Sequence, residues 1–369
     1  MSLVGCRNAA GGVAECRRSV TGLSQVCKIG RTRDGFLPLR PIYVAGDNKN
    51  ADLRRFGPGP ATLRILFPLR RGQPAFLLLF CYLCRMKILL CNDDGYKARG
   101  IHVLAQIMSG FGDVTVVAPK FHQSAMSCAV SLGVKQLAYK DLPEEGPGKW
   151  TYLDATPASC VKFGLEFKYD HRDPDLVVTG INHGTNASTA ANYSATLGAA
   201  EEAAINGIKA IGVSLCDFRP DADFSAVQAM LPEIMRKVLE DWPENRPGLV
   251  YNINFPAVPL EDIKGVKYAR QGFGHWEKEF EAWDEGSLGA LNDSFLWQHY
   301  RVNLEDGEKA VFMRGTFIND DDDADTADHL LLEQGWVTIA PINIFLTDIQ
   351  EFRRRKSLSE QRDAGGLGD

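Results

Sequence analysis

The sequence has no apolar stretch long enough to cross a membrane as a helix, and few of its cysteines are arranged for pairing. The apolar run at residues 75–80 is far shorter than the roughly 20 residues that a spanning helix needs. It also lies too far from residue 1 for an ordinary signal peptide. We therefore expect no membrane partner for this chain.

Nine cysteines are present, and only Cys81 and Cys84 form a C-x-x-C pair. No second such pair follows, so a zinc or redox centre is not expected. The cysteines after residue 85 stand alone in apolar surroundings, as small core residues do in a reducing compartment. They are Cys91, Cys128, Cys160 and Cys216. This pattern predicts a cytoplasmic location.

The net charge of -6 is divided unevenly along the chain. Residues 1–85 hold 14 Lys and Arg against 4 Asp and Glu, whereas the remainder holds 27 basic and 43 acidic residues. An acidic body is unsuited to general phosphate-backbone binding, so we expect no stable nucleic-acid complex. A small phosphorylated substrate held through a metal ion remains compatible with this charge.

Residues 1–85 differ from the rest because they are Arg-rich, acid-poor and interrupted by Gly and Pro. No helical or alternating apolar period persists there, which predicts a disordered extension. Met86 begins the first clear strand, so this stretch is alternatively a mis-annotated addition before the biological start. A transit peptide is a further interpretation of its composition.

From Met86 onward, strand and helix patterns alternate, which predicts an α/β fold with a mostly parallel sheet covered by helices on both faces. The core is expected over residues 86–257. Residues 258–350 lose this rhythm and are interpreted as closing elements and hairpins or arms that project from the sheet. The acidic run at residues 320–323 lacks the Gly and Glu of a calcium loop and is expected to be a solvated loop. A polar, disordered tail is expected over residues 351–369.

Three loops that follow predicted strands carry the candidate chemistry. The first reads Asn92-Asp93-Asp94-Gly95 after the apolar run at residues 86–91. The carboxyl ends of strands are where open α/β sheets bind ligands. Two adjacent carboxylates repel each other, and a hard divalent cation such as Mg2+ would relieve that repulsion. An ordinary turn is the alternative, because Asn, Asp and Gly are common turn residues.

The second loop, residues 120–127, contains His122 and Ser124. The Ser124 hydroxyl can bind a hard cation or cap a helix. His122 is either a general acid or an exposed loop residue.

In the third loop, Asn182 offers a neutral oxygen ligand, and Ser194 and Thr196 stand at the start of an Ala-rich helix. Free N–H groups and the positive dipole end at a helix start favour a phosphate, although an ordinary N-cap explains the same residues.

Taken together, the three loops resemble the SurE (survival protein E) family of nucleotide phosphohydrolases. The resemblance covers roughly residues 86–348. Its strongest blocks are residues 92–95 with Gly100-Ile101, residues 118–119 with Gln123, Ser124 and Ser127, and residues 180–196.

The resemblance implies a phosphatase domain over residues 86–350, with a Rossmann-like, doubly wound core over residues 86–257, that hydrolyses phosphomonoesters of nucleosides. It implies one divalent metal ion, Mg2+ or Mn2+, and self-association into dimers or tetramers through C-terminal arms. Carried over by position, the metal ligands are Asp93, Asp94, Ser124 and Asn182. The phosphate-binding set is Asn186, Ser194, Ala195 and Thr196. The catalytic residues are Asp93 and Asp94, one of which would act as a base toward a metal-assisted water.

The chain departs from the family pattern where Gly is usual, at Ser188 and Ala195, and where Pro is frequent, at Lys209. Ser188 and Ala195 motivate an alternative, a nucleotide-sensing module without turnover. A haloacid-dehalogenase-type phosphatase is a second alternative, but it needs an Asp where this chain has Gly95. The preferred base, the 5′ or 3′ position, the metal, a polyphosphatase activity and the oligomer size are not determined by the sequence.

Overall fold

The computed structural model describes residues 86–133, 136–143, 145–169, 174–282, 304–313 and 315–365, together with the backbone of four short strands before residue 37. The chain divides into two compact units, Met1–Gln73 and Pro74–Asp369. In the first unit the strands form an antiparallel sheet in the order β1 (Arg7–Ala9), β2 (Val13–Val20), β3 (Leu23–Thr32) and β4 (Gly35–Phe36). The other residues before Met86 lie outside the described part, and the disordered or mis-annotated extension stays a prediction.

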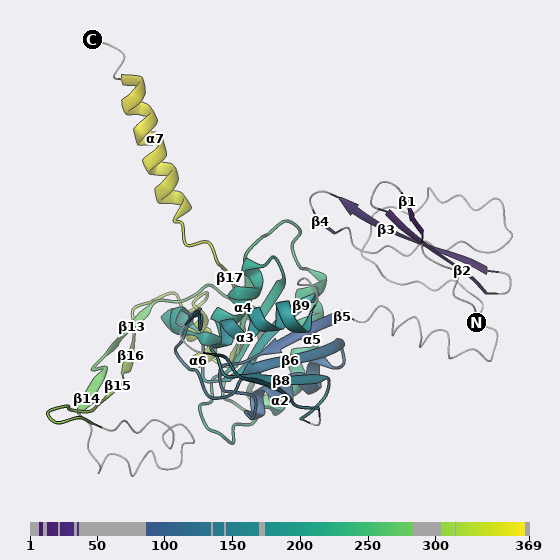
Figure 1. Cartoon of the computed structure of the whole chain (residues 1–369). Coiled ribbons are helices and arrows are strands. Elements are labelled where there is room, and N and C mark those ends of the chain that lie inside the picture. Colours follow the sequence, from purple (N-terminus) through teal and green to yellow (C-terminus); the bar gives the residue numbers. More distant parts are fainter. Residues whose placement is uncertain are drawn as a thin grey trace. The chain divides into compact units, whose positions relative to one another are not determined.

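The second unit is built on a nine-stranded sheet (Figure 1). Its strands lie in the order β12 (Gly265–Tyr268), β17 (Trp336–Asn343), β11 (Leu249–Phe255), β10 (Lys209–Leu215), β9 (Leu176–His183), β5 (Met86–Cys91), β6 (Gly112–Pro119), β8 (Lys149–Leu153) and β7 (Tyr139–Asp141). The six strands from β11 to β8 are parallel, and β17 and β7 join them antiparallel. The predicted α/β, mostly parallel sheet is confirmed.

The burial of strand β5 on both faces explains why its sequence is apolar from Ile88 to Cys91 and does not alternate with polar residues. Ile88 and Leu90 are fully buried in one core, and Leu89 and Cys91 are fully buried in a second core on the opposite face. Successive side chains of a strand point to opposite faces, so a strand covered on both sides needs apolar residues throughout.

Helices cover both faces of the sheet. On one face α2 (Arg99–Met108) packs against α5 (Ser225–Glu240), and on the other α3 (Pro157–Phe163) packs against α4 (Ala195–Ile205). The sheet is therefore doubly wound, as expected. The structure also contains the short helical segments η2 (Gly164–Lys168), η3 (Ser188–Tyr193), η4 (Leu260–Asp262) and α6 (Asp328–Glu333).

The segment after residue 258 contains the expected hairpin elements. One antiparallel ladder pairs β13 (Gly274–Glu277) with β16 (Thr316–Asn319), and a second pairs β14 (Phe280–Ala282) with β15 (Val311–Met313). We call these four strands the arm; Figure 1 shows it in light green.

Where the sequence analysis expects a disordered tail, the structure has helix α7 (Ile349–Gly365). Its residues are mostly polar, and ion pairs such as Glu351–Arg354 at 2.6 Å link its neighbouring turns. The boundaries proposed between core, arms and tail stay a prediction.

Candidate active site

The candidate residues gather where the strand order reverses. Strand β5 pairs with β6 on one side and with β9 on the other, so the chain winds away from β5 in both directions. Such a switch point leaves a crevice at the carboxyl ends of the two central strands. Because Cys91 of β5 pairs with Thr179 of β9, residues 92–94 leave the sheet beside residues 180–182, which continue along β9.

Asp93 is almost fully buried at this point. Its Oδ1 accepts a hydrogen bond from the Thr196 hydroxyl over 2.5 Å, and its carbonyl oxygen accepts one from the Gln123 amide over 2.7 Å. Burial and the neighbouring Asp94 carboxylate raise the pKa of Asp93 to about 7, while the Thr196 bond opposes that shift. Loss of the proton from this carboxyl is therefore harder than from an ordinary aspartate unless a positive charge lies beside it.

Asp94 lies beside His183 at the end of β9 and beside His122 in the loop after β6. Its Oδ2 accepts a hydrogen bond from the His183 backbone amide over 3.2 Å, and its Oδ1 lies 3.4 Å from His122 Nδ1. The bond to His183 fastens the β5 loop directly to the end of β9. Its proximity to His122 places an ionisable imidazole beside the carboxylate pair, a neighbour that the sequence motif alone did not connect to Asp94.

Asn182 lies within β9 rather than in the loop after it, and it is buried. Its amide nitrogen donates to the carbonyl oxygen of Gly184 over 2.9 Å. This bond fixes the amide orientation and leaves the side-chain oxygen as the group available to a cation. Asn182 immediately precedes His183, whose amide holds Asp94, so the structure brings the two predicted ligands together.

Ser124 lies in an exposed loop directly after Gln123, the residue whose amide binds the Asp93 carbonyl. The same loop contacts α4 closely, because a Cβ on Gly198 would lie 2.1 Å from the Ser127 carbonyl oxygen. Gly198 therefore permits a close approach that a larger residue would prevent. The structure joins the Ser124 loop to the Asp93 loop through its backbone.

The predicted phosphate-binding residues surround the start of α4. Ser194 is its N-cap, and its hydroxyl accepts a hydrogen bond from the Leu197 amide over 3.1 Å. Ala195 is the first helical residue, and its φ is not positive, so the methyl group in place of glycine introduces no backbone strain there. Thr196 differs from expectation in one respect: its hydroxyl already serves Asp93.

Asn186 is buried within a network of polar side chains. Its amide nitrogen donates to Ser214 Oγ over 2.8 Å, its backbone amide donates to Asn254 Oδ1 over 2.9 Å, and Asn252 Nδ2 donates to its carbonyl oxygen over 2.8 Å. Asn252 and Asn254 lie on β11, so the central sheet positions this loop. The sequence analysis assigned neither of these two asparagines to the site.

The donor set suits a hard divalent cation. Two carboxylates, an amide oxygen and a hydroxyl supply only oxygen, the ligand that Mg2+ and Mn2+ prefer. In the described residues no group of three or more His, Cys, Asp and Glu side chains surrounds a common point. The raised pKa of Asp93 shows that its ionised form is unfavourable there without a nearby cation.

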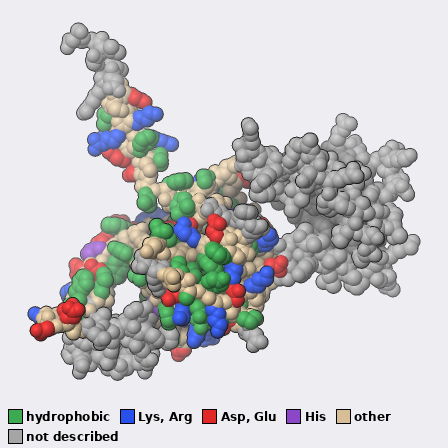
Figure 2. Space-filling model, in the orientation of Figure 1, with side chains coloured by type: hydrophobic (Ala, Val, Ile, Leu, Met, Phe, Trp, Pro, Cys, Tyr) green, Lys and Arg blue, Asp and Glu red, His purple; other side chains and the backbone are tan. Residues whose placement is uncertain are grey.

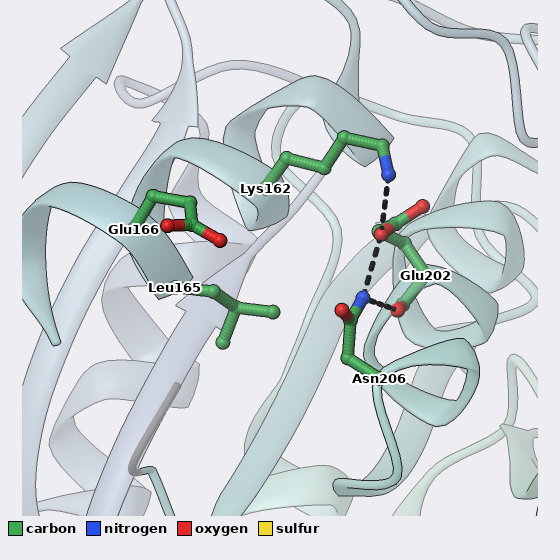
Figure 3. Close-up of a pocket in the computed structure, with 5 residues that line it drawn as sticks. All are labelled: Lys162, Leu165, Glu166, Glu202 and Asn206. Atoms are coloured by element: carbon green, nitrogen blue, oxygen red, sulfur yellow. Dashed lines mark hydrogen bonds and ion pairs between the residues drawn. The ribbon is translucent and has the colours of Figure 1, made fainter. Parts of the chain in front are cut away.

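A separate pocket on the flank of the sheet has no such chemistry (Figure 3). It lies between the α3–η2 segment and α4. Its Glu202 carboxylate binds Lys162 and Asn206, each over 2.7 Å. Lys162, Glu202 and Asn206 therefore satisfy one another across the pocket. None of the predicted site residues lines it.

Comparisons with known proteins agree with this geometry. A family model described as survival protein SurE matches residues 88–278. A 5′-nucleotidase SurE of Cytophaga hutchinsonii is 40% identical over 262 residues, which cover 70% of this chain and 92% of that protein. The chain belongs to the SurE family. A second 5′-nucleotidase SurE, from Christiangramia forsetii, is 38% identical over 70% of this chain and 92% of its own length.

The fold of a SurE protein has been solved for Aquifex aeolicus, and it is similar to this one. The TM-score is 0.57 at 26% identity, and the match covers 74% of this chain and 99% of that chain. The predicted family is therefore confirmed. The names of the SurE relatives agree with the predicted nucleotide phosphohydrolase and favour neither alternative. Among the described helices, none combines the length and apolar character that a bilayer crossing requires.

Proposed function

We propose that this SurE protein is a metal-dependent nucleotidase that hydrolyses nucleoside monophosphates to a nucleoside and phosphate. The observation that carries the proposal is the fastening of Asp94 to the end of β9, beside Asn182, with Asp93 bonded to the first turn of α4. Metal-ligating oxygens and a phosphate-binding helix start therefore belong to one site. The names of the SurE relatives support the same activity.

Asp93, Asp94, Ser124 and Asn182 would hold one Mg2+ or Mn2+ ion. When bound, the ion would supply charge neutralisation and a polarised phosphoryl oxygen. The start of α4 and Asn186 would orient the phosphate through N–H groups. The carboxylate of Asp93 or Asp94 would accept a proton from the attacking water, and His122, beside Asp94, is placed to give a proton to the departing nucleoside oxygen.

The test is phosphate release from a panel of 5′- and 3′-nucleoside monophosphates with Mn2+ or Mg2+, repeated after EDTA. We expect activity that EDTA abolishes and added metal restores. Asp93→Asn should reduce turnover by at least about a hundredfold, because it removes a charged ligand.

Asp113→Asn is the matched control, because Asp113 lies at the opposite end of the neighbouring strand β6 and is exposed. It should retain wild-type turnover. Absence of metal-dependent release from every nucleotide, or full activity in folded Asp93→Asn, would contradict the proposal.

Self-association through the arm is part of the same proposal. Phe280, Val311 and Met313 on the arm strands are more than half exposed, and Figure 2 shows green apolar patches along the arm. Exposed apolar side chains on a projecting hairpin favour burial against another copy. Light scattering should give a dimer or tetramer, and charged substitutions at these three positions should lower the mass. The cytoplasmic location stays a prediction.

A further inference from the structure

We infer that Asp328 is a positioning residue for the phosphate-binding segment, which it fastens to the base of the arm. The inference rests on the proposed function. None of the hydrogen bonds to the Asp328 side chain comes from a predicted metal ligand. We call residues 185–196 the phosphate segment; it contains Asn186 and η3 and ends in the first turn of α4.

Asp328 begins α6 and is completely buried. Its Oδ1 accepts three backbone hydrogen bonds, from Ser188 over 2.9 Å, from Gly272 over 2.9 Å and from His329 over 2.8 Å. One carboxylate oxygen therefore joins the phosphate segment, the stretch before β13 and α6. Such a convergence of amides on a buried carboxylate is stronger than ordinary neutral bonding.

Neighbouring bonds reinforce this junction. Gln271 Nε2 donates to the Ser188 carbonyl oxygen over 3.0 Å, and the Thr189 hydroxyl donates to the Gly274 carbonyl oxygen over 2.6 Å. Both partners of the phosphate segment, Gln271 and Gly274, stand at the base of the arm. The backbone amide of Asp328 in turn donates to the Arg270 carbonyl oxygen over 3.0 Å.

The phosphate segment is thus held from two sides. Side chains of β10 and β11 hold Asn186, and the Asp328 junction holds Ser188 two residues later. At its far end, the Ser127 amide donates to the Tyr193 carbonyl oxygen over 3.1 Å. Loss of Asp328 would leave the Ser188 and Gly272 amides without their buried acceptor and would free the middle of the segment.

The close packing around Asp328 also explains why residue 272 is a glycine. A Cβ there would lie 2.2 Å from His329 Nδ1 and 3.2 Å from Asp328 Oδ1. The backbone must approach the carboxylate closely enough for its amide to bond, and only glycine leaves that room. Sequence reasoning assigned neither Gly272 nor Asp328 to the site.

The experiment compares Asp328→Ala with Asp328→Asn in the full chain, after wild-type phosphate release has been established. Asp328→Ala should raise KM for nucleoside monophosphates by about tenfold or more while changing kcat less, because a misplaced binding group weakens substrate positioning. Asp328→Asn retains an oxygen acceptor and should restore KM to within about threefold of wild type. Mn2+ affinity, measured by direct titration without substrate, should change little in both.

The matched control is Asp175→Ala. Asp175 Oδ2 accepts the Lys87 backbone amide over 2.7 Å at the opposite end of the sheet. The Asp175→Ala substitution should lower the free energy of unfolding without raising KM. Should Asp328→Ala fail to fold, Gln271→Ala removes a weaker part of the same junction, and we expect an increase in KM of about threefold.

A folded Asp328→Ala protein with wild-type KM would overturn the inference. So would an Asp328→Asn protein whose KM is as high as that of Asp328→Ala. If Asp328→Ala does not fold, a wild-type KM in Gln271→Ala would overturn it instead. Failure of the proposed function is a separate result, since it would appear as absent turnover in the wild-type protein.

Discussion

The Thr196 hydroxyl donates a hydrogen bond of 2.5 Å to Oδ1 of Asp93. The bond connects the first turn of α4 to the loop that follows β5, so a displacement of α4 would also displace Asp93, the proposed metal ligand. It also opposes the burial that raises the pKa of Asp93. The proposed metal ligand Asp93 and the proposed phosphate-binding helix are consequently one structural unit.

Thr196→Val should weaken metal binding. The substitution preserves the side-chain shape but removes the donor, so the Asp93 carboxylate loses a bond worth about 1.5–3 kcal/mol. We expect the Mn2+ dissociation constant to rise by about tenfold or more. Isothermal titration with Mn2+ measures it, and Thr196→Ser, which keeps the hydroxyl, should bind as the wild type does. Equal affinity for Mn2+ in the valine variant would show that the bond has no role in metal binding.

The metal-free protein should lose stability as pH rises from about 4 to about 7. The pKa of Asp93 is raised from 3.8 to about 7 in the folded protein, so within this window the folded state holds a proton that the unfolded state has released. The free energy of unfolding should fall by at most about 4 kcal/mol across it.

Denaturant unfolding in EDTA at several pH values checks this trend. Asp93→Asn should flatten it, because the substituted side chain does not titrate. Added Mn2+ should restore stability most strongly at the upper end of the window, where the ionised carboxylate is available. A metal-free stability that rises through the window would contradict the assignment to Asp93.

Ser188→Gly should stabilise the protein by about 1 kcal/mol. Ser188 has φ of 53°, where glycine is favoured, and its buried hydroxyl is among the described polar groups that lack a hydrogen-bond partner. Glycine removes both penalties and is opposed only by its greater freedom in the unfolded chain. Thermal unfolding measures the change. Ser188→Ala is the control, because it removes the hydroxyl but keeps the strained φ, and it should stabilise less.

Gly100→Ala should destabilise the fold and weaken metal binding. A Cβ at Gly100 would lie 2.0 Å from the carbonyl oxygen of Ile181, the residue before Asn182. Helix α2 and strand β9 would have to separate, at a cost of about 3 kcal/mol. Thermal unfolding and Mn2+ titration check both effects. Gly110→Ala, whose Cβ would lie 3.3 Å from its nearest neighbour, should lower stability only slightly. An equal loss of stability in both variants would show that the close approach at Gly100 has no special role.

The sequence by itself determined the sheet, the family and the candidate ligands. Strands buried on both faces must be apolar throughout, so β5, β6 and β9 were visible as runs, and the polar residues that follow them marked the ligand edge. The strand β8 and helix α3 were not predicted, because each is short and has little period of its own. These local signals depend only on neighbours along the chain.

Only the tertiary structure decided which groups touch. The bond from Thr196 to Asp93 spans 103 residues, and the bond from Ser188 to Asp328 spans 140. The raised pKa of Asp93 arises mainly from its burial, and the shared acceptor at Asp328 gains partners from distant segments. Such terms exist only once the parallel sheet has brought its strand ends together and excluded water from them, because no local pattern records which loops will meet there.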